Sequence, residues 1–151
     1  MKLLCVCLGN ICRSPMAAAV LRHQAAQHPH TRSWIIDSAG TGAWHIGKPA
    51  DRRTIAVLRR EGVPSDHRAR QVQPADFHVF DRILAMDRQN LADLQARQPR
   101  DATAILELFG DYDPHGIAEV PDPYYGEDAG FDTVYAQVLR CTQAFIGRHG
   151  R

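Results

Sequence analysis

Continuous apolar runs along this chain alternate with stretches in which apolar residues recur every three or four positions. The first run is apolar from Leu3 to Leu8, which is typical of a strand covered on both faces. The clearest helical spacing joins Phe131, Val134, Val138, Cys141 and Phe145. The whole pattern predicts strands at 2–7, 34–36, 82–86 and 104–109, and helices at about 15–27, 52–61, through Leu91 and Leu94, and through 131–145.

Residues that start and stop helices refine these boundaries. Ser14 fits an N-cap, with Pro15 at the first helical position. Asp51 is placed to cap the second helix, and Gly62 to end it. Three glycines and a proline predict a loop over residues 38–49. The second long loop, at 110–128, is rich in Asp, Pro, Gly and Tyr, and a loop of that length is usually functional.

Strands that alternate with helices predict an α/β fold, with a four-stranded parallel sheet between two layers of helices. The chain has 151 residues, and we expect one domain spanning residues 1–151. The formal net charge of +1 gives no support for binding nucleic acid or a membrane surface. No apolar run approaches the roughly 20 residues of a membrane-spanning helix. The opening apolar run is too short for a secretion signal.

The four cysteines are not spread as a disulfide framework would be, because Cys5, Cys7 and Cys12 lie within eight residues and Cys141 is remote. We therefore expect free thiols and a reducing, cytoplasmic environment. A metal site is one alternative, but Cys5-x-Cys7-x4-Cys12 lacks zinc-ligand spacing. Another alternative is that these cysteines are small buried hydrophobic residues. We expect no metal and no cofactor.

The stretch from Cys7 to Arg13 joins the first strand to the first helix and carries a distinctive chemistry. Such a loop points successive backbone N–H groups into one concavity, and the helix N-terminus adds positive potential, so the site suits phosphate-like anions. Arg13 offers a planar fork for two anion oxygens. The same field favours a reactive thiolate at Cys7, to which the Ser14 hydroxyl is placed to donate. Gly9 and Asn10 tolerate unusual backbone angles.

Four motifs follow one another along the chain. The first and most specific is Val6-Cys7-Leu8-Gly9-Asn10-Ile11-Cys12-Arg13-Ser14-Pro15. The others are His67-Arg68-Ala69-Arg70-Gln71, Met86-Asp87-Arg88-Gln89-Asn90-Leu91 and Asp122-Pro123-Tyr124-Tyr125-Gly126. Together they resemble the motifs of the low-molecular-weight protein tyrosine phosphatases. This resemblance implies a flavodoxin-like fold with the phosphate-binding loop directly after the first strand.

The resemblance also implies a reaction, namely hydrolysis of phosphotyrosine and aryl phosphates through a phosphocysteine on Cys7. Asp122 would be the general acid and base, although the sequence alone does not separate it from Asp111, Asp113 or Asp128. Arg13 would bind phosphate together with the backbone of Leu8, Gly9, Asn10, Ile11 and Cys12. The implied partners are phosphotyrosine proteins, with a tyrosine kinase among the candidates, and we expect a monomer.

Supporting roles follow from the same resemblance. His67 would brace Asn10, Asp87 would belong to the network that holds the arginine, and Ser14 would support the nucleophile. Cys12 would form a reversible disulfide with Cys7 and so make the enzyme redox-regulated.

Aromatic residues would shape the substrate slot. Trp44, Tyr124 and Tyr125 suit a phenyl phosphate, with Ile11 contributing to specificity. A loop aromatic packed onto the domain is the alternative for Trp44.

Two other functions compete with this prediction. An arsenate reductase of the same fold needs resolving cysteines after the middle of the chain, and the stretch from Arg82 to Asn90 has none. A non-catalytic phosphate-binding module would be signalled by loss of Cys7 or Asp122, and both are present. The sequence leaves the physiological substrate open.

Overall fold

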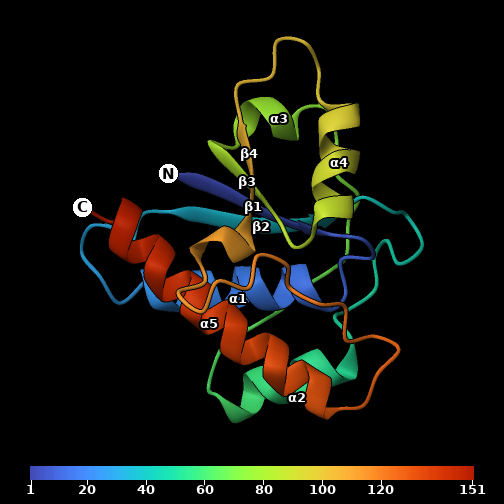
Figure 1. The fold of residues 1–151 in the computed structure, drawn as a ribbon, viewed down its shortest axis with the longest axis vertical. Coiled ribbons are helices and arrows are strands. Elements are labelled where there is room, and N and C mark those ends of the chain that lie inside the picture. The colour runs from blue at the N-terminus through green and yellow to red at the C-terminus, as the bar shows by residue number, and fades with distance from the viewer.

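A four-stranded parallel sheet forms the centre of the computed structural model, which describes residues 1–151 (Figure 1). The strands lie in the order β2-β1-β3-β4, so β1 is an inner strand with neighbours on both sides. This order is that of flavodoxin-like sheets. The strands are β1 (Lys2–Cys7), β2 (Ile35–Gly40), β3 (Arg82–Ala85) and β4 (Ile105–Leu108).

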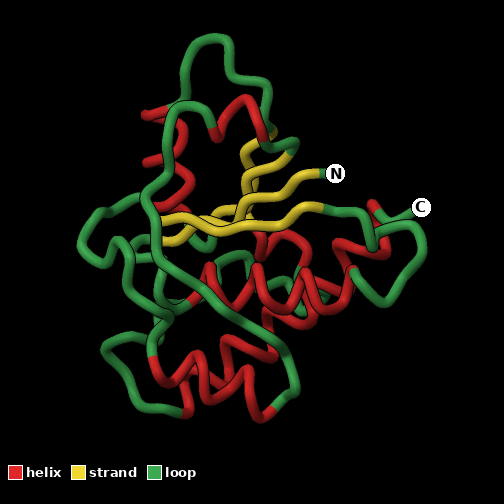
Figure 2. The backbone as a smooth tube through the Cα atoms, turned by 180° about the vertical axis from the view of Figure 1, so that it is seen from behind, coloured by secondary structure: helices red, strands yellow, loops and turns green.

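Helices cover both faces of the sheet, as predicted. On one face lie α1 and α5, with α2 packed against them, and on the other lie α3 and α4 (Figure 1). Seen from behind, the strands separate these two groups of helices (Figure 2). The helices are α1 (Arg13–Ala25), α2 (Arg52–Arg60), α3 (Asp76–Val79), α4 (Arg88–Arg97) and α5 (Ala129–His149), with a 3₁₀ turn at Phe109–Tyr112. None of these helices combines the length and apolarity needed to cross a bilayer.

The alternation of side chains along β1 divides the core into two parts. Leu3, Cys5 and Cys7 face the layer of α1, α2 and α5, whereas Leu4 and Val6 face α3 and α4. All five side chains are buried, which explains why the strand is continuously apolar. The C-terminal end of this buried strand leads directly into the loop between Cys7 and Arg13.

Several predicted boundaries differ from the observed ones, and two of the differences bear on the site. β2 continues to Gly40, where the glycines had predicted a loop, because residues 38–40 pair with residues 5–7 of β1. A Cβ atom at Gly40 would lie only 2.8 Å from the carbonyl oxygen of Leu8, so this glycine permits close packing. Helix α1 begins at Arg13 with Cys12 as its N-cap, so Ser14 lies within the first turn and does not cap it. Its hydroxyl has other partners, described below.

Other elements match the predicted pattern. Asp51 caps α2 by accepting a hydrogen bond from the backbone N–H of Arg53 at 2.8 Å. Gly62 follows α2 with a positive φ of 70°, which favours glycine. The five apolar residues that predicted the last helix are buried along α5. The four-residue helix α3 was missed, because a single turn has too few positions to show a period.

Candidate active site

A pocket of about 430 Å³ opens beyond the C-terminal end of β1, where the chain turns into α1. In parallel α/β sheets, ligands bind at this edge where neighbouring connections diverge. Two sequence-distant segments complete the walls, the loop after β2 and the loop before α5. The lining residues are Cys7, Leu8, Gly9, Ile11, Cys12, Arg13, Trp44, His45, Asp122, Tyr124 and Tyr125.

Cys7 lies at the end of β1, and its sulfur is 3.0 Å from the hydroxyl oxygen of Ser14. The amide nitrogen of Asn10 donates a hydrogen bond of 2.8 Å to that same hydroxyl oxygen. The hydroxyl hydrogen is therefore free to be donated, and the carbonyl of Ala39 is a more distant acceptor at 3.4 Å. Ser14 is thus oriented to donate a hydrogen bond to the sulfur of Cys7. The hydroxyl of Ser14 therefore serves Cys7 and does not cap the helix.

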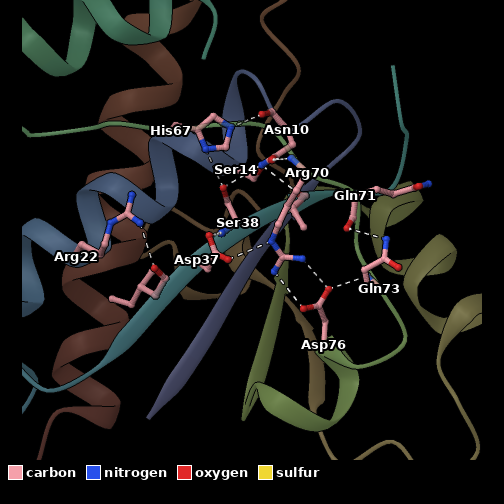
Figure 3. Close-up of polar contacts among 12 residues, drawn as sticks. Asn10, Ser14, Arg22, Asp37, Ser38, His67, Arg70, Gln71, Gln73 and Asp76 are labelled. Carbon is pink, nitrogen blue, oxygen red and sulfur yellow. Dashed lines mark hydrogen bonds and ion pairs between the residues drawn. The ribbon is translucent and has the colours of Figure 1, made fainter. Parts of the chain in front are cut away.

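Asn10 has a positive φ of 56°, and no other non-glycine residue of the chain does. Its buried side chain is fully used: the amide nitrogen also donates to Ser38 at 2.9 Å, and the amide oxygen accepts from the backbone N–H of Arg70 at 2.9 Å (Figure 3). Asparagine tolerates left-handed backbone better than most residues. These contacts hold the middle of the loop from Cys7 to Arg13, the expected phosphate loop, in one conformation.

His67 contacts the loop at the same point, as the resemblance led us to expect. Its Nε2 lies 2.6 Å from the backbone carbonyl oxygen of Asn10, so this nitrogen carries a hydrogen and donates (Figure 3). Its Nδ1 lies 3.4 Å from the hydroxyl of Ser38. Burial lowers the pKa of His67, and the bond to Asn10 opposes that shift only in part. His67 is therefore neutral at physiological pH.

Arg70 anchors the segment that carries His67. Its guanidinium donates to Asp76 through two nitrogens, at 3.0 and 3.1 Å, and to Asp37 at 3.1 Å (Figure 3). The sequence placed Arg70 within a motif but assigned it no role. Ser38 was also missed, because its glycine-rich surroundings predicted a loop. Only the pairing of β2 with β1 reveals that Ser38 faces Asn10.

Arg13 is buried and held from two sides. Its Nη1 donates to the carboxylate of Asp87 at 2.6 Å and to the carbonyl of Val120 at 3.0 Å. Its Nη2 lies 3.6 Å from Asp122. Burial alone would lower the pKa of Arg13, but the negative charges of Cys7 and Asp87 outweigh it and raise that pKa. The guanidinium therefore stays charged, with Nε and Nη2 making no hydrogen bond to the protein.

Asp87 also shapes the element that carries it. One carboxylate oxygen accepts from the backbone N–H of Asn90 at 2.8 Å, which caps α4, while the other receives Arg13. In return, the side chain of Asn90 accepts from the backbone N–H of Asp87 at 3.2 Å, which completes a capping box. The orientation of Arg13 is thereby tied to the start of α4.

Asp122 is the carboxylate that the fold brings to Cys7. It lines the pocket with 39% of its side chain exposed, and it accepts a hydrogen bond of 3.1 Å from the backbone N–H of Tyr124. The three other aspartates that the sequence left open do not line this pocket. Asp113, for example, is buried and paired with Arg140 through two bonds of 3.0 Å. The geometry thus separates Asp122 from Asp111, Asp113 and Asp128.

Aromatic residues stand at the mouth of the pocket. Trp44 is 68% exposed and Tyr125 is 93% exposed, and the rings of Tyr124 and Tyr125 meet edge to face at 4.8 Å. Most of the Trp44 side chain is thus open to solvent, although one part of its ring packs against Gly42 of the same loop. Ile11 also lines the pocket. So does His45, which the sequence analysis missed because it is one of eight histidines and belongs to no recognised motif.

The four cysteines are free thiols, and they divide into two pairs. Cys7 and Cys12 line the pocket, whereas Cys5 and Cys141 lie in the core. Burial raises the pKa of Cys12 to about 12, with a further contribution from Asp51. No group of three or more His, Cys, Asp or Glu side chains has the geometry to hold a metal ion.

Comparison with known proteins places this geometry in a family. The sequence model of the family described as low molecular weight phosphotyrosine protein phosphatase matches residues 2–148. A protein of that name from Homo sapiens is 46% identical over 147 residues, which cover 96% of this chain and 93% of the human one.

Solved structures agree with that match. A protein tyrosine phosphatase from Entamoeba histolytica superposes with a TM-score of 0.91 at 41% identity, covering 98% of this chain and 96% of the other. A Drosophila arginine phosphatase superposes with a TM-score of 0.92 at 34% identity, covering 99% and 98% of the two chains.

Proposed function

This chain belongs to the low molecular weight phosphotyrosine protein phosphatase family of hydrolases, and we propose that it cleaves phosphotyrosine and aryl phosphates through a phosphocysteine on Cys7. The observation that supports this most directly is the meeting of Cys7, Arg13 and Asp122 in one pocket. A nucleophile, a fixed cation and an acid are the groups that phosphate-ester cleavage needs. We also treat residues 1–151 as one phosphatase domain.

In the first step, the thiolate of Cys7 attacks phosphorus as the bond to the aryl oxygen breaks. Asp122, in its protonated form, gives its proton to the leaving oxygen, so a neutral phenol departs. Arg13 binds two equatorial oxygens through Nε and Nη2, the nitrogens that make no hydrogen bond to the protein. Backbone N–H groups of residues 8–12 and the N-terminus of α1 hold the remaining charge.

In the second step, a water molecule attacks the phosphocysteine from the side that the phenol has left. Asp122, now a carboxylate, accepts a proton from this water as the phosphorus–oxygen bond forms. The phosphorus–sulfur bond breaks, and Cys7 leaves as a thiolate. The hydroxyl of Ser14, 3.0 Å from that sulfur, stabilises the departing charge. Inorganic phosphate and the original enzyme result.

The walls of the pocket support an aromatic substrate. Trp44, Tyr124 and Tyr125 surround its mouth, and Ile11 gives it an apolar flank. A phenyl ring packs against such walls and reaches the sulfur at the floor, whereas phosphoserine is too short to gain those contacts. Because one structural relative is an arginine phosphatase, phosphoarginine is the informative competitor. We infer phosphotyrosine proteins as partners, a tyrosine kinase among the candidates.

The arsenate reductase alternative finds no support in the position of the thiols. Its mechanism needs a resolving cysteine after the middle of the chain, and the one cysteine there, Cys141, is buried within α5 outside the pocket. A non-catalytic module is also disfavoured, because both Cys7 and Asp122 line the pocket. The free thiols suit a reducing compartment, and we infer a cytoplasmic enzyme. We also infer that Cys12 protects the nucleophile Cys7 from over-oxidation.

The proposal is tested by kinetics of three variants on p-nitrophenyl phosphate and a phosphotyrosine peptide. Cys7→Ser should abolish turnover, by more than about 10⁴-fold. Asp122→Asn should lower kcat/KM by about 10²–10⁴-fold, the usual contribution of a general acid. Asp111→Asn, an exposed aspartate outside the pocket, is the matched control and should change nothing.

Substrate competition completes the test. The phosphotyrosine peptide should be cleaved faster than matched phosphoserine and phosphoarginine peptides. Turnover by Cys7→Ser, or an Asp122→Asn variant with full activity, would overturn the mechanism. Reduction of arsenate with thioredoxin by the unmodified enzyme would favour the reductase instead.

A further inference from the structure

Arg53, in the first turn of α2, makes a planar ion pair with the aspartate that caps its own helix. Its Nε donates to one carboxylate oxygen of Asp51 at 3.0 Å, and its Nη2 donates to the other at 3.0 Å. The side chains of Arg53 and Asp51 are only 18% and 11% exposed. Two parallel bonds in a partly buried pair hold the guanidinium in one orientation.

The same guanidinium reaches a segment more than seventy residues later. Its Nη2 donates to the carbonyl of Tyr124 at 3.1 Å, and its Nη1 lies 3.5 Å from the carbonyl of Gly126. Its central carbon also lies 4.4 Å from the ring centre of Phe131, at the start of α5. In Figure 1, α2 lies beside the beginning of α5, which brings this arginine next to the loop.

The loop that Arg53 contacts has few other restraints. Between residues 121 and 128, no other side chain from outside the segment donates a hydrogen bond. The one further ion pair joins Arg13 to Asp122 itself, at 3.6 Å. Within the segment, the N–H of Tyr124 binds the carboxylate of Asp122 at 3.1 Å. The N–H that binds the carboxylate of Asp122 and the carbonyl that Arg53 binds therefore belong to the same residue, Tyr124.

The other end of this linkage is the phosphate loop. The backbone N–H of Asp51 donates to the carbonyl of Ile11 at 2.8 Å, and the hydroxyl of Thr54 lies 3.4 Å from the carbonyl of Cys12. The N-terminus of α2 is thus attached to the loop that carries the nucleophile. A continuous series of polar contacts runs from Ile11 through Asp51 and Arg53 to Tyr124.

We propose that Arg53 is a positioning residue that holds the loop of Asp122 at a set distance from the phosphate loop. Arg53 does not line the pocket, so it acts through Asp122 and not on the substrate. This inference rests on the proposed role of Asp122 as general acid. A proton donor becomes much less effective when it is displaced by about an ångström. Contacts that fix the loop of Asp122 therefore affect the rate of proton transfer to the leaving group.

The first experiment compares Arg53→Met with Arg59→Met, an exposed arginine of the same helix with no hydrogen bond to the loop. Arg53→Met should lower kcat/KM for phenyl phosphate about tenfold, and for p-nitrophenyl phosphate only about two- to threefold. The difference arises because the more acidic nitrophenol needs less help from an acid. Arg53→Lys, which keeps the charge but not the fork, should give an intermediate loss, and Arg59→Met none.

Leaving-group dependence is the decisive readout, because the ratio of the two kcat/KM values is independent of how much enzyme is folded. A loss of general stability would lower both values equally and would overturn the proposal. The same holds if Arg59→Met changes the ratio as much as Arg53→Met does.

The second experiment combines Arg53→Met with Asp122→Asn. If Arg53 acts through Asp122, Arg53→Met should not lower kcat/KM further once Asp122 has been replaced. An unchanged tenfold loss in the Asp122→Asn background would overturn the positioning role while leaving Asp122 as the acid. If Asp122→Asn alone retains full activity on phenyl phosphate, the proposed function itself fails, which separates the two conclusions.

Discussion

Arg13 illustrates why single residue types matter at this site. One of its terminal nitrogens is occupied by Asp87 and Val120, at 2.6 and 3.0 Å, and the rest of the fork faces the pocket. A lysine has one nitrogen on a flexible stem, so it would satisfy the buried partners or the ligand but not both. In the proposed mechanism, the planar fork therefore holds the buried partners and binds phosphate at once.

Cys12 carries the redox prediction at the residue scale. Peroxide oxidises the thiolate of Cys7 to a sulfenic acid, and attack by the sulfur of Cys12 forms a disulfide and releases water. Burial and the nearby Asp51 raise the pKa of Cys12 to about 12, so the attacking thiolate is scarce at neutral pH. Disulfide formation should therefore accelerate by up to about tenfold per pH unit between pH 7 and 9. The rate is measured by quenching peroxide-treated samples at successive times and titrating the remaining free thiols.

Reversibility supplies the control. After peroxide treatment, dithiothreitol should restore most activity to the unmodified enzyme and to Cys141→Ser, whose thiol lies in the core. Cys12→Ser should stay inactive, because its sulfenic acid is oxidised further. Equal recovery by Cys12→Ser would contradict a protective role for Cys12.

At the scale of elements, the segment from His67 to Gln71 functions as a brace. It lies along the end of β2, where the N–H of Gly40 donates to the carbonyl of Arg70 at 2.8 Å, and it binds both the side chain and the carbonyl of Asn10. This segment has neither helical nor extended strand structure. Its contribution is a set of polar contacts that keep a left-handed asparagine in place.

His67 gives this brace a pH dependence. Burial lowers its pKa below the ordinary 6.5, so the unfolded chain binds a proton more readily than the folded one. Its contribution to the free energy of unfolding is fully present above pH 6.5 and is lost as the pH falls through the folded-state pKa. Thermal unfolding followed by circular dichroism should show Tm falling between pH 7 and 5.

His67→Gln retains a hydrogen-bond donor but does not titrate. It should be less stable at pH 7.5, and it should show a smaller fall of Tm toward pH 5 than the unmodified protein. His30→Gln, at an exposed histidine whose side chain makes no hydrogen bond or ion pair, is the control and should keep the full pH dependence. A His67→Gln variant with an unchanged pH profile would show that other groups cause it.

At the scale of the whole molecule, the order β2-β1-β3-β4 determines what meets at the pocket. The inner strand β1 carries Cys7, and the segments that follow β2, β3 and β4 supply Trp44, Asp87 and Asp122. The site is therefore assembled from every strand connection and exists only in the folded protein. A ligand that binds there must stabilise the fold as a unit.

Inorganic phosphate should therefore raise Tm. At about 100 times its Kd, a ligand stabilises a protein by about 2.7 kcal/mol, which corresponds to about 5–10 °C for a chain of this size. Differential scanning fluorimetry measures the shift, with sodium chloride at equal ionic strength as the control. Arg13→Lys should show a smaller shift, because it loses the fork. An equal effect of chloride would indicate general salt stabilisation and not a phosphate site.

Much of this architecture was readable from local pattern. The buried strand before Cys7, the cap at Asp51 and the apolar period of α5 each depend on neighbours a few positions away, and each was predicted. The predicted boundary of β2 was wrong because a distant strand pairs with it, and the predicted start of α1 was wrong because the Ser14 side chain has other partners. Gly40 belongs to a strand because β1 pairs with it, and the hydroxyl of Ser14 contacts Asn10 and Cys7 and does not cap the helix.

By itself, the sequence determined the alternation of strands and helices and the place of a cysteine and an arginine at the ends of one loop. The spacing of apolar residues and the residue types are local properties, so both can be read from the sequence without the fold. Only the tertiary structure separated Asp122 from three other aspartates and brought Ser38 to Asn10. It also placed Arg53 between the phosphate loop and the loop of Asp122. Those contacts span up to about a hundred residues, and chain folding alone decides which distant groups come within hydrogen-bonding distance.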